Sequence, residues 1–180
     1  RQMCIRDRYR KMNMPIEKIA SMLDDPAVSE ELVRQLQALM AEIPYRVSNL
    51  ANASALLWLS LPDINWVGFY RLTGDKLVLG PFQGKPACIV IPVGRGVCGT
   101  AAQENRVVRV ENVHTFPGHI ACDSASNSEI VLPLYDGKAL WGVLDIDSPA
   151  LSRFRAEDEA GLRQIAAVLN DMLTNTNEKT

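Results

Sequence analysis

Three cysteines stand within 35 residues in the middle of the chain: Cys88, Cys98 and Cys122. Each lies beside a glycine-rich stretch, and loops on a rigid scaffold are where reactive groups usually sit. A single cysteine is more often a small buried hydrophobe, and Cys88, which is followed by Ile89 and Val90, fits that interpretation best. Three thiols in such contexts favour redox or nucleophilic chemistry.

Local electrostatics distinguish the two loop cysteines. Cys98 begins a predicted helix, where backbone N–H groups and the helix dipole favour a thiolate. Cys122 follows His119 by three residues, which can stabilise a thiolate if the loop turns back. The neighbouring Asp123, however, raises the pKa of the Cys122 thiol. On these grounds alone, Cys98 is the more reactive thiol.

Acidic residues form a second group. Asp145 and Asp147 end an otherwise apolar predicted strand, and residues two apart on a strand point to the same side. Glu129 opens the neighbouring predicted strand and can join them. The alternative for each residue is a solvated sheet edge. Beside the thiols, the carboxylates indicate a site for an ammonium group, where a carboxyl of raised pKa can donate a proton to a leaving oxygen.

Two aromatic residues of the first predicted strand also share one side, because Trp66 and Tyr70 are four residues apart. They are either core residues or an apolar wall for a small side chain or a cation, and both interpretations stay open.

Metal binding has weak support in the sequence. The cysteines form no CxxC pair, so the sequence contains neither a zinc ribbon nor a thioredoxin-like motif. A zinc site built from Cys88, Cys98, Cys122 and His119 is an alternative, but its spacing is scattered and lacks a knuckle. We therefore expect no metal and no other cofactor.

The predicted elements suit an α+β domain. Apolar spacings of three and four predict helices over 29–43, 45–60 and 155–173, and a short helix covers 96–104. Short β-rich runs separated by Gly, Pro and Asp predict strands over 65–72, 76–79, 87–91, 107–110, 130–135 and 139–146. We expect a mainly antiparallel sheet with the N-terminal and C-terminal helices on one face, which leaves the other face free for a pocket.

The composition fits one domain. The chain has 180 residues, 47% of them hydrophobic, and a formal net charge of -2. We expect a basic leader over 1–14, disordered or non-native, a domain over 15–173 and a frayed polar tail over 174–180. Without a long basic stretch nucleic acid is not an expected partner, and the longest apolar run, 54–61, is too short for a bilayer. A cytoplasmic location with reduced thiols is expected.

Five stretches carry a family resemblance: LPDINWVGFY, GPFQGKPAC, IPVGRGVCGTAA, FPGHIACDSASNSEIVLPL and GVLDIDSP. They closely resemble the free methionine-(R)-sulfoxide reductases, which are stand-alone GAF-domain enzymes. The similarity covers roughly residues 45–169 and leaves out the basic leader. A GAF fold alone would be weak evidence of catalysis, because it also hosts ligand sensors. The three cysteines in these contexts are more specific.

The resemblance implies a role for each candidate residue. Cys122 resembles the attacking cysteine, Cys88 the main resolving cysteine and Cys98 an auxiliary one, which reverses the electrostatic preference for Cys98. The remaining candidates resemble substrate-binding residues: the acidic group Glu129, Asp145 and Asp147, and the pocket aromatics Trp66 and Tyr70.

The resemblance also implies the reaction. Free L-methionine-(R)-sulfoxide is reduced to methionine through a cysteine sulfenic acid and an intramolecular disulfide, which thioredoxin reduces. A homodimer is expected on the same basis. Two alternatives remain: a non-catalytic GAF module that binds a small ligand, and a thiol redox sensor without substrate turnover.

Overall fold

The fold is built on one six-stranded antiparallel sheet with the strand order β3-β2-β1-β6-β5-β4. The computed structural model describes residues 26–118 and 123–176, so the predicted leader and residues 177–180 of the predicted tail lie outside the described residues. The strands are β1 (Trp66–Thr73), β2 (Lys76–Gly84), β3 (Val90–Pro92), β4 (Val108–Val110), β5 (Ser128–Asp136) and β6 (Ala139–Ser148).

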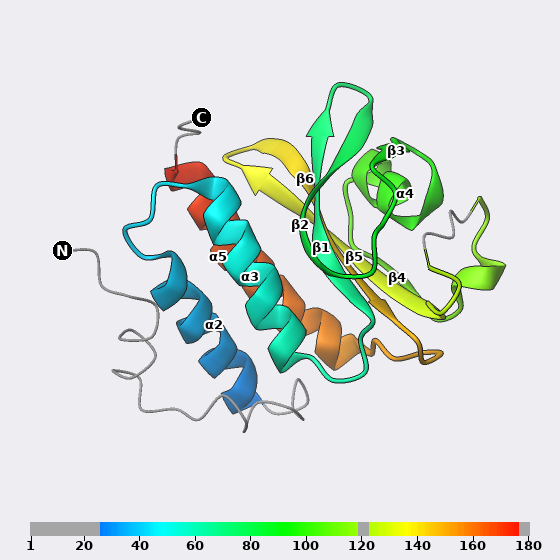
Figure 1. The fold of residues 1–180 in the computed structure, drawn as a ribbon, viewed down its shortest axis with the longest axis horizontal. Helices are drawn as coiled ribbons and strands as arrows, with labels where there is room; N and C mark the ends of the chain where they lie inside the picture. Colours follow the sequence, from blue (N-terminus) through cyan, green and yellow to red (C-terminus); the bar gives the residue numbers. More distant parts are fainter. Residues whose placement is uncertain (1–25, 119–122, 177–180) are drawn as a thin grey trace.

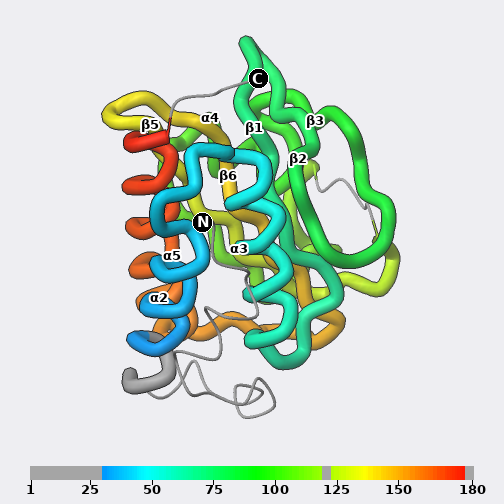
Figure 2. Tube along the Cα trace, turned by 60° about the vertical axis from the view of Figure 1, so that its left-hand side comes forward, coloured from blue at the N-terminus to red at the C-terminus, as the bar shows by residue number. Residues whose placement is uncertain are grey.

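Three helices cover one face of the sheet (Figure 1): α2 (Pro26–Met40), α3 (Arg46–Ser60) and α5 (Ala156–Asn175). α3 and α5 pack on the strands, and α2 packs against these two helices (Figure 2). Their buried side chains recur at helical spacing, with Leu32, Leu36 and Leu39 on α2 and Leu162, Ile165 and Leu169 on α5. Within the described ranges, none of the helices has the length and apolar character that a membrane crossing requires.

The opposite face of the sheet carries the short helix α4 (Gly96–Glu104). A second apolar cluster lies between α4 and the strands, and it includes Trp66, Tyr70, Val97, Cys98, Val131 and Val143. The predicted α+β architecture is confirmed. Helix α4 forms a second layer on this face. The candidate residues described below meet between α4 and the sheet.

Several boundaries differ from the sequence prediction. α2 begins at Pro26, a residue suited to a first helical turn, rather than at the predicted residue 29. α5 continues to Asn175, and Arg46 donates to the Thr176 carbonyl oxygen at 2.6 Å just beyond its end. The predicted end at residue 173 and the frayed tail from 174 are therefore wrong for these described residues.

The β2 and β3 strands also differ from the prediction. β2 extends to Gly84 instead of ending at Leu79, because β1 pairs along it from Thr73 to Trp66. The strand predicted over 87–91 is only Val90–Pro92. The chain leaves the sheet before Pro86, which cannot donate a ladder hydrogen bond. Residues 85–89 are free to form a loop beside the candidate site.

Candidate active site

Strand register brings the acidic residues together. β6 lies between β1 and β5, with Asp147 opposite Trp66 on one side and opposite Glu129 on the other. Directly opposed residues share a face of the sheet, and Asp145, two residues from Asp147, points the same way. Three carboxylates and an indole ring therefore project toward α4.

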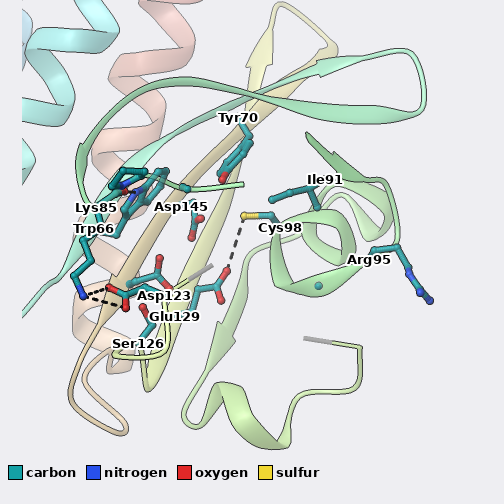
Figure 3. Close-up of a pocket in the computed structure, with 14 residues that line it drawn as sticks. Trp66, Tyr70, Lys85, Ile91, Arg95, Cys98, Asp123, Ser126, Glu129 and Asp145 are labelled. Carbon is teal, nitrogen blue, oxygen red and sulfur yellow. Dashed lines mark hydrogen bonds and ion pairs between the residues drawn. The ribbon is translucent and has the colours of Figure 1, made fainter. Parts of the chain in front are cut away.

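These side chains line one cavity, shown in Figure 3, that encloses about 540 Å³ of space, part of it open to solvent. Of the residues singled out in the sequence, Trp66, Tyr70, Cys98, Glu129, Asp145 and Asp147 line this cavity. Cys88 directly follows Ala87, which also lines it. Cys122 and His119 lie outside the described residues, whereas Asp123, the next residue along the chain from Cys122, lines the cavity.

Burial dominates the electrostatics of the acidic group. Glu129 is 7% exposed and Asp145 6%, so a solvated sheet edge does not describe these two residues. Burial raises the pKa of Asp145 to about 6. It also raises the pKa values of Glu129 and Asp147 well above their ordinary range, and the charge of Asp145 adds to both effects. The group thus favours a bound cation or a bound proton.

Cys98 lies in the first turn of α4 and points at Glu129, with 3.9 Å between its Sγ and Oε1 of the carboxylate. The thiol is 3% exposed. Burial raises the pKa of Cys98 well above its usual value, and the charges of Asp145 and Glu129 raise it further. Desolvation and carboxylate charge therefore oppose the thiolate that the helix dipole would favour at Cys98.

Trp66 and Tyr70 do more than fill the core, because both hold the loop that carries Cys88. The Trp66 indole Nε1 donates to the Lys85 carbonyl oxygen at 3.1 Å, and the Tyr70 hydroxyl donates to the Cys88 carbonyl oxygen at 3.0 Å. The two rings stack with 5.9 Å between their centroids. The half-buried Cys88 is thereby fixed beside the cavity.

The sequence did not single out an ion pair at the rim of the cavity. Lys85 Nζ lies 3.1 Å from a carboxylate oxygen of Asp123, and Asn65 donates to the Ser126 hydroxyl at 3.0 Å beside it. Lys85 and Asp123 are 38 residues apart, so no local pattern could have paired them. Lys85 therefore offsets the negative charge of Asp123, which is expected from the sequence to raise the pKa of the Cys122 thiol.

Gly68 leaves room for Phe82 and for the Trp66 ring. A Cβ at this position would collide with the Phe82 Cβ and would lie 2.6 Å from the Trp66 ring. We predict that Gly68→Ala lowers the free energy of unfolding, measured by urea denaturation, by about 1–3 kcal/mol. Gly80→Ala is the matched control, because its nearest atom would be 3.1 Å away. An equal or smaller loss in Gly68→Ala than in the control would contradict the prediction.

Sequence and structure comparisons place the chain among known proteins. The GAF domain model matches residues 31–171. The chain is 60% identical over 149 residues to the free methionine-R-sulfoxide reductase of Escherichia coli, covering 83% of this chain and 90% of the relative. It is 42% identical over 160 residues to the Saccharomyces cerevisiae reductase of the same name, covering 84% and 88%.

A solved structure gives the same result. The free methionine-R-sulfoxide reductase from Neisseria meningitidis, in complex with its substrate, superposes with a TM-score of 0.80 at 42% identity, covering 86% of this chain and 93% of that one. The fold thus matches that of a free methionine-R-sulfoxide reductase whose structure was solved with its substrate. The chain belongs to the GAF domain family and, within it, to the free methionine-R-sulfoxide reductases, a family of oxidoreductase enzymes.

Proposed function

We propose that this chain reduces free L-methionine-(R)-sulfoxide to methionine in the cavity between β1, β5, β6 and α4. The observation that carries this proposal is a group of three carboxylates in this cavity, of which Glu129 and Asp145 are buried and Asp147 is half-buried. These carboxylates have the charge and burial that a substrate α-ammonium needs as partners. The rings of Trp66 and Tyr70 supply an apolar wall for the methyl and sulfur of the substrate.

In the proposed reaction, cysteine thiols and the thioredoxin dithiol supply all the electrons that reduce the sulfoxide. The Cys122 thiolate attacks the sulfoxide sulfur while a carboxyl of the acidic group protonates its oxygen, and methionine leaves as the cysteine becomes a sulfenic acid. The Cys88 thiol then condenses with the sulfenic acid, which forms a disulfide and releases water. A dithiol donor, thioredoxin, reopens the disulfide by exchange and is itself oxidised.

The described residues support the assigned roles. Asp123, the residue that follows Cys122 in the sequence, lines the cavity. Cys88 lies on the loop that Trp66 and Tyr70 anchor. Raised pKa values let a carboxyl of the acidic group stay protonated near neutral pH, as a proton donor requires. A homodimer remains a prediction from the family resemblance.

The ammonium site predicts selectivity for the free amino acid. N-acetylation replaces the substrate ammonium by a neutral amide and leaves buried carboxylates without a cation. We expect kcat/KM for N-acetyl-methionine-(R)-sulfoxide to be at least about 10²-fold lower than for the free amino acid. Thioredoxin-coupled turnover of both compounds measures this ratio. Equal kcat/KM values would refute the ammonium site and would leave the thiol chemistry standing.

The raised carboxyl pKa values predict a pH-dependent affinity. Below about pH 6 Asp145 is protonated and pairs weakly with an ammonium, so substrate affinity should rise as the pH rises through this value. We expect about a tenfold gain between pH 5 and pH 7. Calorimetry with the unreactive Cys122→Ser variant, in two buffers of different protonation heat, should also show proton release near pH 6. An affinity that is constant or falls over this range would contradict the prediction.

A further inference from the structure

We propose that Cys98, Glu129 and Asp145 form a binding site for Zn²⁺ at the floor of the cavity. One sulfur and two carboxylate oxygens, one from each residue, all lie within 4.8 Å of one another. The three residues come from α4, β5 and β6, so a helix and two central strands of the sheet hold the ligand atoms in place. Sites on such elements are more precise than sites on loops.

The separations suit a tetrahedral ion. With Zn–S near 2.3 Å and Zn–O near 2.0 Å, ligand atoms of a tetrahedral site lie about 3.5 Å apart. The Cys98 Sγ and the Glu129 Oε1 are 3.9 Å apart before any metal binds. Small side-chain rotations would close this difference. All three residues line the cavity, so a water molecule in it can serve as the fourth ligand.

A buried carboxylate oxygen without a hydrogen-bond partner is a second observation that favours cation binding here. Asp145 Oδ1 is buried and has no hydrogen-bond partner within the described part of the chain. Two basic residues line the cavity among the described residues, and neither neutralises the cluster. Lys85 pairs with Asp123, and the side chain of Arg95 points away from Cys98 and Asp145 (Figure 3).

The ligand set favours zinc over harder cations. A thiolate selects Zn²⁺ against Mg²⁺ or Ca²⁺, which prefer oxygen ligands alone. As the Zn–S bond forms, the thiol proton leaves to solvent. This set shares only Cys98 with the zinc site considered from the sequence, since Glu129 and Asp145 replace the other two cysteines and His119. Zn²⁺ would bind the carboxylates that we assign to the substrate ammonium, so metal and substrate would compete. This competition rests on the proposed function, whereas the metal site itself does not.

Cobalt provides a direct test. The full chain, kept reduced with a phosphine, is titrated with Co²⁺, and the thiolate-to-cobalt charge-transfer band in the near ultraviolet is recorded. We expect one equivalent of Co²⁺ to produce the band and one equivalent of Zn²⁺ to abolish it. Cys98→Ser should lose the band, whereas the control variants Cys88→Ser and Cys122→Ser should keep it. A band that survives in Cys98→Ser, or that disappears in either control, overturns the proposal.

A second variant keeps the test valid if Cys98→Ser does not fold. Asp145→Asn preserves the side-chain volume and should weaken Zn²⁺ binding, measured by calorimetry, at least about tenfold. Unchanged affinity would overturn the proposal. Free methionine is added as the competitor. A methionine-dependent loss of Zn²⁺ affinity supports the shared site, whereas Cys98-dependent metal binding that methionine leaves unchanged refutes the ammonium assignment and preserves the metal site.

Discussion

The Cys122→Ser variant is expected to lose at least about 10⁴-fold in kcat for reduction of free methionine-(R)-sulfoxide. A serine hydroxyl is not ionised near neutral pH, and it cannot take up the sulfoxide oxygen as a sulfenic acid and pass it on to a disulfide. Thioredoxin-coupled turnover measures the loss. Binding of the substrate to the variant should persist, because the acidic group is intact.

The other two cysteines provide controls for this variant. Cys88→Ser should form about one methionine per chain and then stop with thioredoxin, because the sulfenic acid forms but its main resolving thiol is missing. Cys98→Ser should retain repeated turnover, since burial and neighbouring carboxylates keep the Cys98 thiol protonated. Turnover that survives in Cys122→Ser and fails in Cys98→Ser would reverse the assignment of the nucleophile.

The second large effect is expected at Glu129. Glutamine has nearly the same shape as glutamate and carries no charge, so Glu129→Gln removes one buried partner of the substrate ammonium. Removing one member of a buried ion pair costs about 3–5 kcal/mol, which corresponds to a loss of about 10²- to 5 × 10³-fold in kcat/KM. Steady-state kinetics with the free amino acid sulfoxide measures the loss.

A control variant and a control substrate test whether the loss in kcat/KM arises from the substrate ammonium. The exposed Glu111 lies outside the cavity, and Glu111→Gln should leave kcat/KM unchanged within about threefold. N-acetyl-methionine-(R)-sulfoxide has no ammonium, so wild type and Glu129→Gln should use it equally poorly, as in a double-mutant cycle. A loss below tenfold with the free substrate, or the same loss with both substrates, would contradict the assignment.

Local patterns in the sequence predicted much of the framework. The strand period of two placed Asp145 and Asp147 on one side, and the observed register shows why Glu129 meets them. An Asp-Gly pair favours a tight turn, and Gly137, which follows Asp136 between β5 and β6, has the positive φ, 62°, that such a turn needs. These features depend on neighbours in sequence or on direct strand pairing.

Features that depend on distant contacts were not predictable. Cys98 has favourable local surroundings at a helix start, and its burial, together with the charges of Asp145 and Glu129, opposes their effect on the thiol pKa. The Lys85–Asp123 ion pair joins a loop to the far rim of the cavity. The hydrogen bonds from Trp66 and Tyr70 to that loop also require the folded sheet. The residues in each of these contacts are too far apart in the sequence for helix or strand periodicity to predict the contact.

Turnover of free methionine-(R)-sulfoxide is the most direct measurement of the proposed function. The wild-type chain is supplied with thioredoxin, its reductase and NADPH, and with either the R or the S form as substrate. We expect repeated, thioredoxin-dependent turnover of the R form and none of the S form. Oxidation of the thiols by peroxide without turnover of either sulfoxide would contradict the proposed reaction and would favour a redox sensor. Absence of both responses would favour a ligand-binding GAF module.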